Sequence, residues 1–77
     1  MVGARVSAAR QSMGLSIDDL AARTKIRSSI LVAIESDDFT SCGGDVYARG
    51  HLKSIAAILE IDPDELLDLF DASAGEP

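Results

Sequence analysis

Four side chains suited to protein recognition are gathered in one short stretch of the sequence, SCGGDVYARGHLKS (residues 41–54). They are Tyr47, Arg49, His51 and Lys53, and the chain has no other tyrosine or histidine. Residues four apart are neighbours on a helix surface, so Tyr47 pairs with His51 and Arg49 pairs with Lys53. Tyrosine and arginine are enriched at the centres of protein interfaces. The stretch predicts a partner-binding surface on a helix; the alternative is a tyrosine half-buried over the core beside solvated cations.

The residue types in the chain give little support for catalysis or for a bound metal. Cys42 is the only cysteine, and neither it nor His51 has an adjacent partner that would suggest a catalytic triad. The glycine pair in CGGD lacks the lysine of a phosphate-binding loop. His51, Cys42 and the nearby aspartates do not follow a recognised zinc-ligand spacing. We therefore expect a non-enzymatic domain with no cofactor and no metal.

A second group of polar side chains could contact nucleic acid. These residues are Arg23, Lys25, Arg27, Ser28 and Ser29. The basic ones could contact phosphates, which position a protein on DNA without specifying a sequence. The helix positions that would face the major groove are the two serines with Val32 and Ala33, and none of these can make a bidentate contact to a base. Sequence-specific DNA binding at physiological salt is therefore not expected, although weak binding at low salt is.

The charge distribution also weighs against nucleic acid. Residues 1–34 carry five basic and two acidic side chains, a net charge of +3, whereas residues 35–77 carry two basic and eleven acidic ones, a net charge of −9. A nucleic-acid-binding domain usually has a basic footprint overall. A single cysteine excludes an internal disulfide and favours a reducing cytoplasm. No apolar run approaches the ~18 residues that a membrane span requires, and the first residues do not form a signal peptide.

Hydrophobic spacing predicts an all-α domain, a compact bundle of five short helices. The first expected helix is residues 4–13, with Val6, Ala9 and Met13 on its apolar face. The second is capped by Ser16, with Asp19 completing a weak capping box, and ends near Thr24. The third is residues 28–36, the fourth starts at the N-cap Asp45, and the fifth has Asp62 as N-cap, Pro63 at its first position and Glu65 at its third. Residues 72–77 are expected to form a tail or the start of a linker.

The fourth predicted helix has the clearest periodicity. Its expected buried stripe is Ala48, Leu52, Ile55, Ala56 and Leu59. Gly50 weakens a helix by roughly 1 kcal/mol relative to alanine, so we expect it to serve close packing against another helix or a partner. Phe39, alone in a polar loop, is expected to anchor that loop to the core because large apolar side chains are seldom left in water.

The second and third predicted helices have the spacing of a helix-turn-helix. Ala21 is small enough to let two helices cross closely, and Ile26, Ile30, Leu31 and Ile34 fit the hydrophobic seam. The turn position that usually holds glycine is Lys25, which is therefore expected to have a positive φ at a cost of about 1 kcal/mol. A helix-turn-helix DNA-binding regulator is accordingly the alternative to a protein-interaction domain.

The sequence resembles the N-terminal helix-turn-helix domain of RodZ-family bacterial cell-shape proteins over residues 3–71. The similarity lies in ARQSMGLSIDDLAARTKIRSSILVAIESDDF and GGDVYARGHLKSIAAILEIDPDELL, where VYARGHLK and DPDELL are the most specific segments. The form CGGDVYARGHL is similar to actinobacterial members. More distantly, the first four helices resemble phage-repressor DNA-binding domains, in which positions matching Arg10 and Glu35 form an ion pair.

The resemblance implies a cytoplasmic adaptor domain of a single-pass inner-membrane protein, whose membrane span would follow Pro77. In the family, this domain docks on the actin-like filament protein MreB through its fourth helix. The aromatic positions of the family surface correspond to Tyr47 and His51, and the second of these is commonly aromatic in the family. The departure at His51 leaves another cytoskeletal or cell-wall factor as the alternative protein partner.

Overall fold

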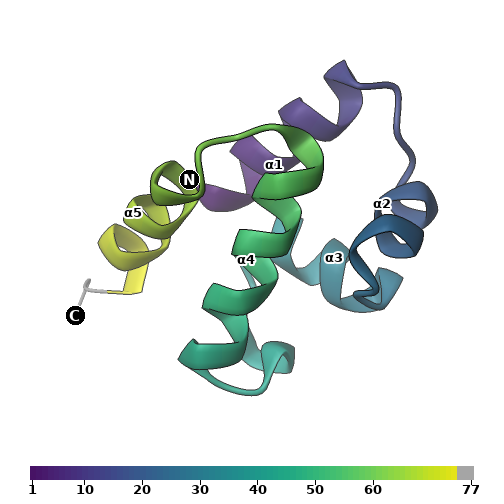
Figure 1. Ribbon diagram of the computed structural model, residues 1–77. Coiled ribbons are helices and arrows are strands. Elements are labelled where there is room, and N and C mark those ends of the chain that lie inside the picture. The colour runs from purple at the N-terminus through teal and green to yellow at the C-terminus, as the bar shows by residue number, and fades with distance from the viewer. Residues whose placement is uncertain (75–77) are drawn as a thin grey trace.

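The computed structural model describes residues 1–74, which form five α-helices and one short 3₁₀ helix (Figure 1). The elements are α1 (Val2–Ser12), α2 (Ile17–Thr24), α3 (Ser28–Glu35), η1 (Thr40–Cys42), α4 (Asp45–Leu59) and α5 (Pro63–Ala74). Residues 1–74 include no strand, so the predicted all-α class is confirmed. Within this range, no helix is both long enough and apolar enough to cross a membrane.

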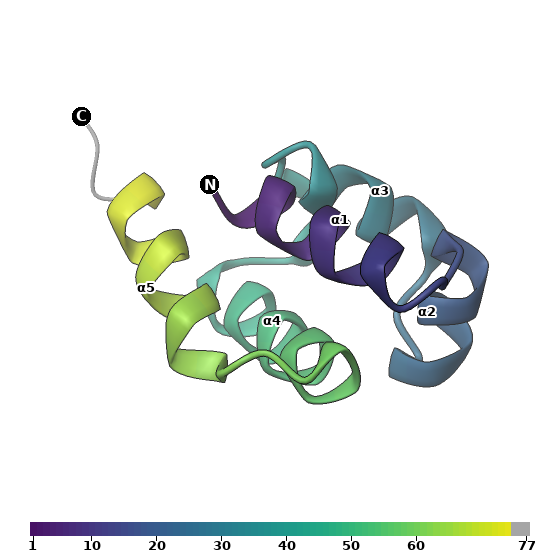
Figure 2. The ribbon, with the colours of Figure 1, turned by 90° about the horizontal axis from the view of Figure 1, so that it is seen from above.

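Helix α4 occupies the middle of the molecule. It lies between α5 on one side and the α2–α3 pair on the other, and the view from above shows the same order (Figures 1 and 2). The core draws apolar side chains from all five α-helices. The largest fully buried ones are Leu20, Leu31, Ile34, Leu52, Ile55, Leu66, Val2 and Val6. A single core of this kind positions the start of α4 against the rest of the domain.

The buried stripe predicted for α4 is confirmed at all five positions, because the 3.6-residue period sets which side chains face inward. The predicted start of the helix was wrong by one residue. Gly44 is the N-cap, and Asp45 is the first helical residue. Gly43 and Gly44 have φ angles of 90° and 114°, which only glycine adopts readily. The two glycines therefore make the sharp turn from η1 into α4.

The helix-turn-helix is built by local hydrogen bonds that the sequence indicated. Ser16 Oγ accepts from the Asp19 N–H at 3.0 Å, and Asp19 Oδ2 accepts from the Ser16 N–H at 2.9 Å, so the predicted capping box is complete. At the other end of α2, Lys25 has a φ of 62°. Its predicted left-handed conformation is confirmed, and it ends α2 so that α3 can begin at Ser28.

The predicted ion pair between Arg10 and Glu35 is confirmed and fastens the end of α1 to the end of α3. Arg10 Nε and Nη2 donate to the two carboxylate oxygens of Glu35 at 2.7 and 3.1 Å, and Nη1 donates to the Leu15 carbonyl at 2.9 Å. The hydrogen bond to Glu35 raises the pKa of Arg10 above its usual value, although partial burial acts in the opposite direction.

Helix α1 begins earlier and faces the core differently than predicted. It starts at Val2 rather than at residue 4, and Val2, Gly3 and Val6 are its buried residues, whereas Met13, predicted on the buried face, is 40% exposed. The Gly3 N–H donates to Asp37 Oδ1 at 2.9 Å. Gly3 also lies directly against the end of α3, where a Cβ would come 2.2 Å from the Glu35 carbonyl oxygen. These contacts to the end of α3 and to the turn that follows it hold the first turn of α1 in place.

Helix α5 starts as predicted and ends later. Asp62 Oδ1 accepts from the Asp64 N–H at 2.9 Å, as expected of an N-cap, whereas the Glu65 side chain pairs with Arg5 on α1. Phe70 is buried and packs edge-on against the partly buried Phe39, with ring centroids 4.9 Å apart, so Phe39 anchors its loop as predicted. The helix continues past residue 71 to Ala74. Residues 75–77 of the predicted tail lie outside the described residues.

Candidate protein-docking site

The start of α4 exposes two adjacent large apolar side chains. Val46 is 80% exposed and Tyr47 is 65% exposed. Such side chains usually lie in the interior, and two side by side on a short domain form an apolar patch. The Tyr47 ring lies over the turn that precedes the helix, because a Cβ at Gly43 would be 3.5 Å from Tyr47 Cδ2. Tyr47 is therefore not buried over the core, which was the alternative arrangement for this residue.

The residues that neighbour Tyr47 on α4 extend this patch. His51 follows it by four positions and is partly buried, so the predicted Tyr47–His51 neighbourhood on one helix face is present. Gly50 follows Tyr47 by three positions, is exposed, and would have no atom within 4 Å of an added Cβ. We call Val46, Tyr47, Gly50 and His51 the α4 surface.

The sequence predicts that Gly50 serves close packing against either another helix or a partner, and the structure contradicts the first of these. The residue does not pack against another helix within residues 1–74. The expectation that it permits close approach of a partner stays a prediction. Sequence reasoning missed Val46 altogether, although its position outside the predicted stripe of α4 was the pattern that could have revealed its exposure.

The two cations predicted to flank Tyr47 lie on the opposite flank of α4. Successive residues of an α-helix are about 100° apart, so Arg49 projects about 200° away from Tyr47. Arg49 Nη2 pairs with Asp71 Oδ1 on α5, and the guanidinium carbon lies 5.5 Å from the centre of the Phe70 ring. Lys53 is exposed and follows Arg49 by one turn. The structure thus brings Tyr47 and His51 together but directs Arg49 into a contact with α5.

The α2–α3 pair presents a face with little capacity to read DNA bases. Ser28 Oγ donates to Asp18 Oδ1 at 2.9 Å, so this hydroxyl is engaged and a carboxylate lies beside it. Ser29 is exposed, Val32 is 52% exposed and Ala33 is partly buried. The exposed cations of this region are Arg23, Lys25 and Arg27. These cations are suited to phosphate contacts, but the exposed face of α3 lacks side chains for bidentate base contacts.

Comparison with known proteins adds two matches. Residues 5–66 match the family described as "Helix-turn-helix domain". The chain is also 36% identical over 73 residues to a protein of Streptococcus pneumoniae (strain ATCC BAA-255 / R6) named "Cytoskeleton protein RodZ". This chain belongs to the RodZ family of helix-turn-helix domains. The aligned region covers 95% of the chain and 26% of that relative, so the chain spans about a quarter of the relative's length. No solved structure gives a significant match.

The region matched by the family ends before the last turns of α5. Residues 5–66 include the helix-turn-helix and all of α4, whereas Phe70 and Asp71 lie beyond them. The α4 surface is therefore inside the family region. The contact of Arg49 with α5 is made to residues outside that region.

Cys42 carries the single thiol of this RodZ-type domain, a group that could in principle act as a nucleophile. It is buried, and burial together with the charge of Asp38 raises the pKa of its thiol, so the reactive thiolate is disfavoured at neutral pH. Within the described part of the chain, no three histidine, cysteine or acidic side chains lie close enough to hold a metal ion.

Proposed function

We propose that this domain is a non-enzymatic adaptor of a RodZ-like cell-shape protein and docks on a cytoskeletal or cell-wall factor through the α4 surface. The observation that carries the proposal is the exposure of Val46 and Tyr47, 80% and 65%, on adjacent positions of the helix that the family resemblance assigns to docking. Tyrosine is among the residue types that most often dominate binding energy when it becomes buried in an interface.

The chemistry of the α4 surface favours a protein partner with a shallow apolar recess. Val46 and the Tyr47 ring supply apolar area, and the tyrosine hydroxyl and the His51 imidazole supply hydrogen-bonding groups near it. Gly50 has no side chain, so a partner backbone could approach the helix closely at that position. A partner of this kind would bury the aromatic ring and leave the two flanking polar groups at the rim.

An MreB-like filament protein is the first partner to test. The relative from Streptococcus pneumoniae is named a cytoskeleton protein, and the family resemblance implies docking on the actin-like MreB through the fourth helix. The histidine at position 51, where aromatic residues are common in the family, makes another cytoplasmic cytoskeletal or cell-wall factor the second possibility. We further propose that the domain is the cytoplasmic part of a protein held at the inner membrane by a segment outside residues 1–77.

The proposal is tested by placing a photocrosslinking amino acid at position 47 of the full-length protein in the bacterium that encodes it. Irradiation should link the domain to a protein of the cytoskeletal or cell-wall class. A matched variant with the same amino acid at Val32 serves as control, because Val32 is also apolar and exposed but lies on α3. Crosslinks to a cytoskeletal protein from position 32 and not from position 47 would contradict docking through α4.

A further inference from the structure

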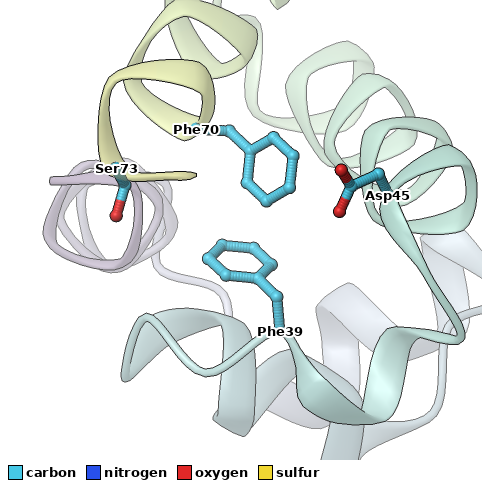
Figure 3. Close-up of a pocket in the computed structure, with 4 residues that line it drawn as sticks. All are labelled: Phe39, Asp45, Phe70 and Ser73. Atoms are coloured by element: carbon cyan, nitrogen blue, oxygen red, sulfur yellow. The ribbon is translucent and has the colours of Figure 1, made fainter. Parts of the chain in front are cut away.

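A small pocket lies on the side of the domain where α4 and α5 meet. It has a volume of about 220 Å³ and is lined by Phe39, Asp45, Phe70 and Ser73 (Figure 3). Pockets for drug-sized ligands measure about 300–1,000 Å³, so this one is closer in size to a single large side chain. Its residues come from the loop after α3, the first turn of α4 and the last turns of α5.

The walls of the pocket combine an aromatic surface with a carboxylate. The rings of Phe39 and Phe70 meet edge-on, with centroids 4.9 Å apart and planes at 69°, and the Asp45 carboxylate faces them from α4 (Figure 3). The Phe70 ring already has one guanidinium beside it, because the Arg49 guanidinium carbon lies 5.5 Å from its centre. Aromatic faces attract cations through the ring quadrupole, and arginine is the cation found there most often.

The charges around the pocket favour a positively charged occupant. The Asp45 side chain is exposed and has no hydrogen-bond or ion-pair partner within residues 1–74. Arg49, the nearby cation, is already paired with Asp71. The last turn of α5, which supplies Ser73, contains no basic residue to balance the partial negative charge of the helix end. Residues 35–77 as a whole carry a net charge of −9.

We propose that this pocket binds an arginine side chain from a segment of a partner protein. The aliphatic stem would lie against the rings of Phe39 and Phe70, and the guanidinium would pair with Asp45. Arginine suits both parts, because its stem covers apolar surface and its planar head stacks on aromatic rings and pairs with carboxylates. Asp45 and Tyr47 are two positions apart on α4 and so project in directions about 200° apart, which means that the proposal does not depend on docking through the α4 surface.

The test is an NMR titration of the 77-residue chain with two capped pentapeptides at low ionic strength. One has the sequence Gly-Ser-Arg-Ser-Gly, and the other has citrulline, the uncharged isostere of arginine, at its centre. The chain has only two phenylalanines and one tyrosine, so ring contacts can be assigned to individual residues. The arginine δ-methylene protons should show contacts to the rings of Phe39 and Phe70. The citrulline peptide should bind at least about fivefold more weakly, because it lacks the charge that the rings and Asp45 attract.

Two variants assign the charge effect to the pocket. Asp45→Asn should weaken binding of the arginine peptide by about threefold. Asp64→Asn removes an exposed acid from the first turn of α5, away from the pocket, and should change the affinity by less than about 1.5-fold. Thermal melting of each variant verifies that it is folded. Equal binding of both peptides, contacts to Tyr47 in place of the phenylalanines, or no binding up to about 10 mM peptide would overturn the proposal.

Discussion

In the α2–α3 pair, polar side chains make hydrogen bonds within the domain, whereas the apolar side chains at the start of α4 project away from it. Ser16 and Asp19 hydrogen-bond to each other at the start of α2, Ser28 donates to Asp18, and Glu35 at the end of α3 pairs with Arg10 on α1. Val46 and Tyr47 on α4 are 80% and 65% exposed. Under the proposed function, helices α1–α3 (residues 2–35) serve as a structural frame, and the surface proposed for recognition lies on the next helix, α4.

Substitutions in the two regions should have different effects on folding and on partner binding. Substitutions that disturb the frame should unfold the domain, because a chain of 77 residues has little stability to lose. Substitutions on the α4 surface should change partner binding and leave the fold intact, because exposed side chains contribute little to folding. Measuring stability and partner binding for matched variants from the two regions therefore tests this difference.

The largest expected effect follows from Gly3→Ala. An added Cβ would come 2.2 Å from the Glu35 carbonyl oxygen, and backbone cannot give way there without separating α1 from α3. We expect a loss of about 2–3 kcal/mol in the free energy of unfolding, typical of overpacking, and a lower melting temperature by roughly 10–20 °C. Denaturant and thermal unfolding measure both quantities. A variant as stable as the wild type would show that this contact does not hold the frame together.

A smaller loss is expected from Glu35→Gln. The substitution keeps the size of the side chain but removes the charge that faces Arg10, whose side chain is only 15% exposed. Leaving this guanidinium without its ion partner should cost about 2 kcal/mol. Glu65→Gln, which breaks the more exposed pair with Arg5, is the matched control and should cost less than about 1 kcal/mol in the same urea titration. Equal costs would mean that partial burial does not strengthen the Arg10–Glu35 pair relative to the exposed pair.

Gly50→Ala should act in the opposite direction on folding and on binding. The site is exposed and an added methyl group meets nothing within 4 Å, so the helix should gain about 0.5–1 kcal/mol. If a partner approaches closely at this position, the same methyl group should weaken its binding. Urea unfolding and a binding assay on the same variant separate the two effects. Destabilisation by alanine would contradict an open helix face.

The smallest expected effect concerns pH and Asp19. Hydrogen bonds from the Ser16 backbone N–H and hydroxyl lower the pKa of Asp19 below its usual value. Because the folded-state pKa is lower than the unfolded one, the stability that Asp19 adds is present above the ordinary carboxyl pKa of about 3.9 and is lost as the pH falls through the lowered value. The difference in unfolding free energy between wild type and Asp19→Asn should therefore be constant above about pH 5 and shrink in more acidic solution. A difference unchanged down to about pH 2 would exclude this linkage.

Local patterns in the sequence predicted those features of the fold that depend on residues close together in the chain. The stripe of α4, the Ser16–Asp19 capping box and the left-handed Lys25 each follow from residues close together in the chain. The Arg10–Glu35 pair, 25 residues apart, was predicted only through the resemblance to repressor-like domains.

Features that depend on distant contacts were missed. The early start of α1 depends on Gly3 fitting against Glu35, and the orientation of Arg49 depends on Asp71, 22 residues further along. Neither contact leaves a periodic pattern in one sequence. For the same reason, the sequence assigns Tyr47, Arg49, His51 and Lys53 to one helix but does not show that Arg49 turns away from Tyr47 to contact α5.

The most direct test of docking through α4 combines Tyr47→Ala and His51→Ala in the full-length protein. Because Tyr47 is 65% exposed, the melting temperature of the domain should fall by only a few degrees, consistent with a cost below about 1 kcal/mol. The amount of cytoskeletal or cell-wall partner that copurifies from the bacterium should fall more than about tenfold, whereas Val32→Ala on α3 should retain it. A folded double variant that copurifies with every partner of the wild type would contradict the account.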